Sequence, residues 1–170
     1  MSKALVAIPV GVIVERSKSA NPWADFYWRA VGVLGGQPDT QAWTKLSDDG
    51  ARATFYAGTA TVELFRSETG FYRDNLASGA PSLWVALRAT NGEPPFSVAA
   101  VTADPAEGES YTETATDLVE QLPMPAAIEQ VVTAFVAKHH VEQPFVKRKR
   151  DRANPEAMAR RPHGLGEDGE

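Results

Sequence analysis

Residues 4–15 read Ala-Leu-Val-Ala-Ile-Pro-Val-Gly-Val-Ile-Val-Glu, and this stretch decides the fold class. Apolar residues occupy every second position, which is the period of a β-strand with one buried face. Pro9 has no N–H to donate to a ladder, so we expect this strand to lie at a sheet edge or to bend there. A long strand of this kind predicts a sheet-based domain. Its buried face is expected to consist of Val6, Ile8, Val10, Val12 and Val14.

Five further segments before residue 103 have strand patterns. Residues 51–57 and 59–65 are predicted to form a hairpin that turns at Gly58. Residues 82–90 and 95–102 are predicted to form a second hairpin, because Asn-Gly at positions 91–92 favours a turn. Short connections between successive strands favour antiparallel pairing. The fifth segment is 26–34. On this segment the residues expected to share a face are Phe26, Trp28, Ala30 and Gly32. On the first hairpin the residues expected to point inward are Phe55, Ala57, Val62 and Leu64.

Helical patterns interrupt and follow these strands. Residues 67–76 predict a short helical turn. The run Asp-Pro-Ala-Glu at 104–107 is a helix start signal, because Asp104 can accept from first-turn N–H groups and Glu107 can close a capping box. This helix is predicted to end at Leu122, before two prolines. Side chains expected to face the sheet are Phe71, Tyr72 and Leu76 on the turn, and Tyr111, Ala115, Leu118, Val119 and Leu122 on the helix.

The most strongly patterned helix is predicted at residues 125–140. Its apolar positions recur at the spacing of an amphipathic helix, so this face must be buried against the sheet. Pro144 is expected to stop the helix. The apolar face consists of Ile128, Val131, Val132, Phe135 and Val136.

These segments predict an α+β domain over residues 1–146. An antiparallel sheet of about six strands, curled toward a half-barrel, is expected to be packed by two C-terminal helices. Residues 147–170 lose all periodicity and lack the apolar content that offsets the entropy of ordering. We therefore expect a basic C-terminal tail of low order.

Charge is divided between these two parts. The net charge is −5, yet residues 1–146 hold 10 Lys/Arg and 17 Asp/Glu, whereas residues 147–170 hold 7 Lys/Arg and 5 Asp/Glu. An acidic body is a poor surface for nucleic acid, because phosphate binding needs clustered cations. The chain has no Cys, which excludes disulfides, iron–sulfur clusters and Cys-type zinc sites. No apolar run approaches the roughly 20 residues of a membrane span, so a soluble, cytoplasmic protein without membrane contact is expected.

No motif for catalysis or metal binding is present in the sequence. Adjacent residues on a helix point about 100° apart, so His139 and His140 are poorly placed to ligate one ion. No serine lies in a nucleophile elbow, and the glycines at 32–36 match neither a Walker loop nor a dinucleotide fingerprint. The sequence therefore predicts no catalytic residue, no metal site and no cofactor, and a non-enzymatic protein.

Binding residues are predicted in two places. Trp23 follows Asn-Pro in a polar loop, and with Arg29 it has the composition of an interface hot spot. The alternative is that Trp23 folds back over the open end of the sheet. The end of the last helix and the basic run form the second place, where a flexible cationic segment suits an acidic partner. The residues predicted there are His140, Phe145, Lys147, Arg148, Lys149, Arg150 and Arg152.

Several blocks of residues resemble an uncharacterised bacterial domain-of-unknown-function family. The resemblance covers most of residues 8–152, and the last block is the most specific. The blocks are Val10-Gly11-Val12-Ile13-Val14-Glu15-Arg16, Asn21-Pro22-Trp23, Trp28-Arg29, Glu63-Leu64-Phe65-Arg66 with Glu68-Thr69, Tyr72-Arg73-Asp74-Asn75-Leu76, Pro123-Met124-Pro125, and His139-His140-Val141-Glu142-Gln143-Pro144-Phe145-Val146-Lys147-Arg148-Lys149-Arg150-Asp151.

Genes of that family tend to lie beside genes for molybdenum- or tungsten-dependent formate dehydrogenases and their maturation factors. The resemblance therefore implies a non-catalytic accessory protein, assembly factor or small subunit of such an enzyme, and it carries over no catalytic residue. Three rival functions stay open on the residues alone: a small-molecule-binding half-barrel, a nucleic-acid-binding module that uses the basic tail, and a hydrolase or transferase with a buried, shifted carboxylate or histidine.

Overall fold

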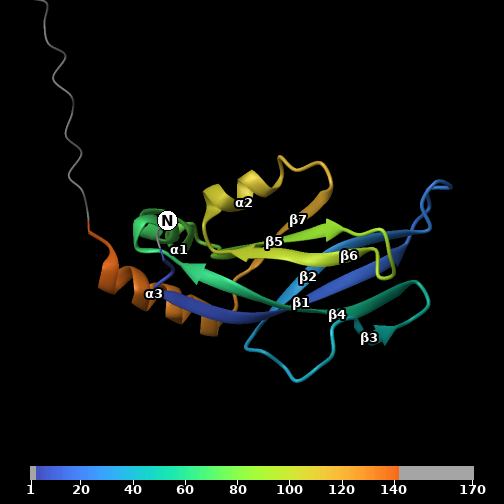
Figure 1. Ribbon diagram of the computed structural model, residues 1–170, viewed down its shortest axis with the longest axis horizontal. Helices are drawn as coiled ribbons and strands as arrows, with labels where there is room; N and C mark the ends of the chain where they lie inside the picture. Colours follow the sequence, from blue (N-terminus) through green and yellow to red (C-terminus); the bar gives the residue numbers. More distant parts are fainter. Residues whose placement is uncertain (1–2, 142–170) are drawn as a thin grey trace, which may run out of the picture. The chain divides into compact units, whose positions relative to one another are not determined.

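The computed structural model describes residues 3–141 of the 170-residue chain. By its internal contacts the chain divides after His140, and the elements named below belong to the unit Met1–His140. No helix among the described residues is long and apolar enough to cross a membrane. In chain order the elements are β1 (Val6–Lys18), β2 (Phe26–Gly35), β3 (Thr44–Asp48), β4 (Arg52–Leu64), a 3-10 turn (Arg66–Glu68), α1 (Thr69–Ala77), β5 (Ser82–Ala89), β6 (Phe96–Thr102), α2 (Pro105–Tyr111), β7 (Asp117–Pro123) and α3 (Ala126–His139) (Figure 1).

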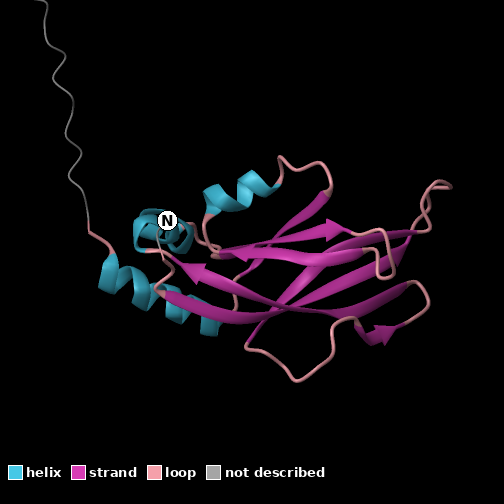
Figure 2. Ribbon diagram, viewed as in Figure 1, coloured by secondary structure: helices cyan, strands magenta, loops and turns pink. Residues whose placement is uncertain are grey.

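The strands form two antiparallel sheets. The first has the order β2-β1-β4-β3 and the second the order β6-β5-β7. β4 lies beside β6 and β2 lies beside β7, so the sheets pack together without closing into a barrel (Figure 2). The predicted α+β class and antiparallel pairing are confirmed. The predictions of one six-stranded sheet and of two C-terminal helices were wrong, because the described residues form seven strands and three α-helices.

Both sheets and two of the helices contribute to one hydrophobic core. The predicted inward face of β1 is buried at Ile8, Val10, Val12 and Val14 and half-buried at Val6, and β5 is buried along most of its length. At one end of the core, α1 packs on α3 through the rings of Tyr72 and Phe135, whose centroids lie 6.1 Å apart. The apolar core residues with no exposed surface are Val10, Val12, Val14, Val62, Leu64, Leu83, Val85, Leu87, Ala103 and Val132.

Two β-bulges flank β1 at Ile13. β4 inserts Ala57 between the partners of Val12 and Ile13, and β2 inserts Val31 between the partners of Ile13 and Val14. One extra residue reverses the faces of the strand beyond it. The predicted alternation of residues 26–32 is therefore wrong past the bulge: Gly32 pairs with outward-facing Ile13 and leaves the face that it was expected to share with Trp28 and Ala30.

The predicted hairpin at Gly58 does not exist. Residues 52–64 form one continuous strand, β4, and Gly58 has a φ of 131° inside it, next to the bulge. Glycine is suited to this position because a side chain there is strained. The turn signal was real, but it marked a bulge. The predicted inward residues Ala57, Val62 and Leu64 are buried, and Phe55 is half-buried.

β1 is a central strand, so the prediction that Pro9 places it at an edge was wrong. The carbonyl of Pro9 accepts a hydrogen bond from Gly36 N–H at 3.1 Å. In an antiparallel ladder the N–H of a residue faces the same neighbour as its carbonyl. The missing N–H of Pro9 therefore faces Gly36, which lies just beyond the end of β2 at Gly35. No hydrogen bond between β1 and β2 is lost within the range of β2.

The helix predicted from residue 104 to 122 is two elements. Asp104 starts α2 as predicted, since its Oδ1 accepts from Ala106 N–H at 2.8 Å and Glu107 N–H at 3.3 Å. α2 ends at Tyr111, however, and residues 117–123 form β7, which pairs with β5. Leu118 and Leu122 are four residues apart, a spacing that suits a strand as well as a helix. Glu107 bonds Thr102 and Tyr111, so the predicted capping box is absent.

The helix predicted at residues 125–140 is confirmed as α3. Ile128, Val132 and Phe135 are buried, whereas Val131 is 38% exposed. On α1, Tyr72 is buried as predicted, but Phe71 is 44% exposed and does not face the sheet.

Gly108 of α2 is required by its contact with Trp84. A Cβ at position 108 would lie 2.2 Å from Cγ of Trp84. We expect Gly108→Ala to destabilise the fold by about 1–3 kcal/mol, although alanine is the better helix former. Gly70→Ala in α1, where a Cβ meets nothing within 4 Å, is the matched control and should be neutral or slightly stabilising. Urea unfolding of both variants checks this, and equal stabilisation by both substitutions would contradict the packing.

Asp104 should make stability depend on pH. Burial raises the pKa of its carboxyl above the ordinary value of 3.8, against the opposing effect of two backbone N–H bonds. The folded state then holds the proton more tightly, so the contribution of Asp104 to stability falls as pH rises through the window above 3.8. Asp104→Asn keeps the capping oxygen and should lose this slope. Asp104→Ala should cost about 1 kcal/mol. Unfolding free energies measured across this window test both, and an unchanged slope in Asp104→Asn would refute the assignment.

Candidate binding surface

The loop between β1 and β2, residues 19–25, exposes the side chain of Trp23 to solvent. Its own hydrogen bonds shape the loop: Asn21 N–H donates to Ser19 Oγ at 3.0 Å, and Asn21 Oδ1 accepts from Trp23 N–H at 3.0 Å. Ser19 N–H closes the loop by donating to the carbonyl of Asp25 at 3.1 Å. The side chain of Trp23 is 91% exposed. The alternative that Trp23 folds back over the sheet is therefore wrong.

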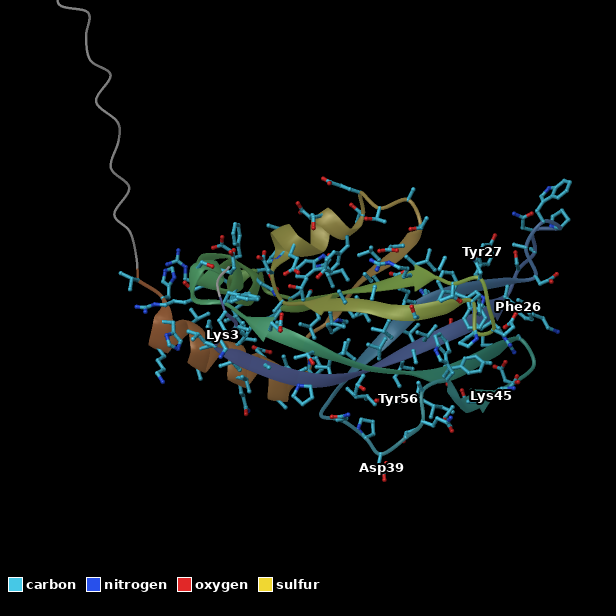
Figure 3. The ribbon with its side chains drawn as sticks, in the orientation of Figure 1. Lys3, Phe26, Tyr27, Asp39, Lys45 and Tyr56 are labelled. Carbon is cyan, nitrogen blue, oxygen red and sulfur yellow. The ribbon has the colours of Figure 1, made fainter. Side chains whose placement is uncertain are left out.

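Two further aromatic side chains are exposed where β2 begins. Phe26 is 38% exposed and Tyr27 is 56% exposed, and Figure 3 shows both close to the loop that carries Trp23. Successive residues of a strand point to opposite faces, so Phe26 and Tyr27 flank the strand. We call the surface formed by Trp23, Phe26 and Tyr27 the aromatic end.

A packed ring cluster supports the aromatic end from beneath. The guanidinium of Arg16 lies 4.5 Å from the ring centroid of Phe26 and 5.4 Å from that of Phe55. Stacking of this kind holds a cation without a carboxylate partner. The rings joined in this cluster, with centroid distances of 5.8–6.2 Å, are Trp28, Trp43, Phe55 and Phe96.

Trp43 enters this cluster with a strained backbone. Its φ is 67°, the one positive φ of a non-glycine residue among the described residues. Its ring meets Trp28 edge-on at 6.1 Å, and its N–H donates to the carbonyl of Tyr56. Packing therefore holds a conformation that a tryptophan rarely adopts. Trp43 is therefore a packing residue of the ring cluster.

The turn between β3 and β4 adjoins the same end. Lys18 N–H donates to the carbonyl of Ala51 at 3.0 Å, which ties the end of β1 to this turn. The side chain of Lys45 donates to Asp48 at 2.9 Å and, with the N–H of Gly50, lowers the pKa of that carboxyl. The ammonium group of Lys45 and the carboxylate of Asp48 therefore place a positive and a negative charge beside the aromatic end.

Arg29 lies on the outer face of the first sheet. Its Nη2 is 3.6 Å from Oε1 of Glu15 on the neighbouring strand, and its side chain remains 59% exposed. Because residues 27 and 29 share a face of β2, Arg29 borders Tyr27. Arg29 thus belongs to the outer rim of the aromatic end rather than to the ring cluster.

His140 is at the other end of the first unit from Trp23. Its Nδ1 is 3.1 Å from Thr69 Oγ1, and its Nε2 is 3.1 Å from Nη1 of Arg73. The ring of His139 packs on Phe135, with centroids 4.7 Å apart. The β1–β2 loop and the end of α3 lie at opposite ends of the sheets (Figure 1). The two predicted binding places therefore do not form one continuous surface within the described residues.

Five of the predicted cations and one aromatic residue lie beyond residue 141. The predictions made for Phe145, Lys147, Arg148, Lys149, Arg150 and Arg152 fall outside the described residues.

The exposure of Phe26 and Tyr27 was not predicted from sequence. A signal for this surface does exist: the inward series Val10, Val12 and Val14 continues at Arg16, and a charge in an inward position marks the end of an apolar core. Within residues 3–141, no three His, Cys, Asp or Glu side chains gather as metal ligands would.

No curated protein and no solved structure matches the chain. The model of one family, the proteins of unknown function DUF3305, matches residues 9–149, which is more than half of the chain. The chain therefore belongs to the DUF3305 family of proteins of unknown function.

Proposed function

We propose that this chain is a non-catalytic binding protein that docks on a partner protein through the aromatic end. The observation that carries the proposal is Trp23, 91% exposed on a loop that its own hydrogen bonds preform. Tryptophan is enriched among hot-spot residues, because it buries a large area with few rotamers. A preformed loop also loses little entropy on binding.

The side chains around Trp23 also have the composition of a protein interface. Phe26 and Tyr27 extend the apolar surface, and Arg29 adds an exposed guanidinium beside them. Aromatic residues and arginine are enriched in interface cores relative to other surfaces. The ring cluster that contains Arg16 gives this surface a rigid base, so docking requires little rearrangement.

The partner that we propose is a formate-dehydrogenase-type molybdoenzyme or one of its maturation factors, in the cytoplasm. This identity rests on the family resemblance of the sequence blocks and on no contact in the fold. The chain would act as an accessory protein, assembly factor or small subunit. The rival function, a small-molecule-binding half-barrel, needs an open space between the sheets. At this end the rings of Trp28 and Phe96 meet across the two sheets and fill that space.

Replacing Trp23 by alanine should weaken partner binding by about 2 kcal/mol, or about 30-fold, while the fold remains stable because little of the ring is buried. The measurement is an affinity pull-down from the native host, read by mass spectrometry, followed by titration of the captured partner. Leu34→Ala near the other end of β2 is the control, since Leu34 is also an exposed apolar residue. Equal capture by both variants would argue against the aromatic end.

Replacing the five cations at positions 147–150 and 152 by serine should weaken association and remove most of its salt dependence. Charge pairs are screened by salt, whereas apolar contacts at Trp23 are not. Titration of the captured partner at several salt concentrations measures the slope. A control with Arg160→Ser and Arg161→Ser should keep most of the native slope, and an unchanged slope in the fivefold variant would end this role for the run.

A further inference from the structure

A seam runs between the two sheets, where β4 and β6 lie beside each other. β3 pairs with β4 only over residues 53–56, so residues 57–64 of β4 pair on one side alone, with β1. β6 pairs only with β5. No ladder joins β4 to β6 in the described part of the chain. Peptide groups on both facing edges are therefore left as donors and acceptors.

A hollow of about 310 Å³ opens on this seam. Small side chains from both strands line it, among them Thr59, Thr61 and Ala99, so the strand edges stay accessible from the hollow. Its volume is at the lower limit for ligand sites, which suits one long side chain better than a drug-sized molecule.

Acidic side chains border the hollow. Glu63 and Glu107 line it, and none of its described lining residues is Lys, Arg or His. Glu107 is held in place, because Thr102 Oγ1 donates to Oε2 at 2.8 Å and Tyr111 OH donates to Oε1 at 2.9 Å. Burial raises the pKa of Tyr111, so this phenol remains a donor. A carboxylate has about four acceptor positions, and two of those on Glu107 remain for a ligand.

A second hollow, of about 440 Å³, continues from the first. The two share Phe65 and Glu107, and the second adds Glu68 and Asp104. Again no Lys, Arg or His is among its described lining residues. The two hollows together form an acidic groove with an aromatic rim at Phe65 and Phe71.

We propose that the seam hollow is an anchor pocket for an arginine side chain presented by a partner protein. A guanidinium has five donors in a fixed plane. It can bond Glu63 or Glu107 at the mouth and the edge carbonyls of β4 and β6 inside. A lysine, as a single point charge, uses fewer of these acceptors. The inference goes beyond the proposed function, because it concerns a different surface from the aromatic end.

The test is a titration of the ¹⁵N-labelled full chain with the peptide acetyl-Ala-Arg-Ala-amide, followed by NMR. The peptides with citrulline or lysine in place of arginine are the comparisons, and citrulline keeps the shape without the charge. We expect shifts at residues 59–63 and 98–102, and affinity about tenfold higher for arginine than for citrulline. The chain's own cations at 147–150 and 152 could compete with the peptide for the hollow. The titration is therefore repeated with a variant in which these five residues are serine.

Variants locate the site. Glu63→Gln should weaken binding of the arginine peptide about tenfold, and Glu63 is exposed, so the unchanged spectrum should confirm the fold. Glu129→Gln on α3 is the matched control and should bind as the native chain does. Trp23→Ala should also bind normally, which separates this inference from the proposed function. The proposal would be overturned if neither the native chain nor the fivefold serine variant showed shifts, or if the shifts were confined to other residues. Equal affinities for the arginine and lysine peptides would also overturn it.

Discussion

The structure depends on the paired bulges that flank Ile13. β1 runs unbroken through the first sheet, while β2 and β4 each insert one residue beside it, Val31 and Ala57. On the side of Ile13 that holds Val10 and Val12, the inner face is aliphatic. On the other side, the inner face also carries Arg16, Trp28 and Phe55. The bulges therefore divide one sheet into an aliphatic part, which packs on the second sheet and the helices, and an aromatic part at the opposite end.

This division explains why the candidate binding surface lies where it does. The bulge in β2 sends Trp28 inward against Phe96 of the second sheet and leaves Tyr27 and Arg29 outward. Phe26 then lies over Arg16 at the margin of the core. The loop that carries Trp23 extends from this packed base and is shaped by its own hydrogen bonds. Rigid aromatic surfaces of this kind are suited to recognition.

Sequence patterns predicted the parts of the fold in which local and tertiary preferences agree. β1, α3 and the β5–β6 hairpin follow their apolar periods, and Asp104 starts a helix by capping chemistry. Failures occurred where one signal fits two structures. Gly58 can mark a turn or a bulge, and the spacing of Leu118 and Leu122 suits a helix or a strand; β7 forms because β5 offers an edge to pair with.

The candidate site was less accessible to sequence reasoning than the fold. Trp23 was predicted because an aromatic residue in a polar loop is unusual, but its exposure depends on hydrogen bonds from Ser19 and Asn21 that periodicity does not reveal. The exposure of Phe26 and Tyr27 was missed because it depends on where the packed core ends, which the alternation of a single strand does not reveal. Arg16 contained the available signal, a charge that continues an inward apolar series.

Site-specific photo-crosslinking in the native host tests the central claim most directly. p-Benzoylphenylalanine is placed at position 23 in one strain and at position 34 in another, and the adducts are identified by mass spectrometry. The account predicts one dominant adduct from position 23, with a formate dehydrogenase subunit or maturation factor, and no such adduct from position 34. No protein adduct from position 23, or the same adducts from both positions, would contradict docking through the aromatic end.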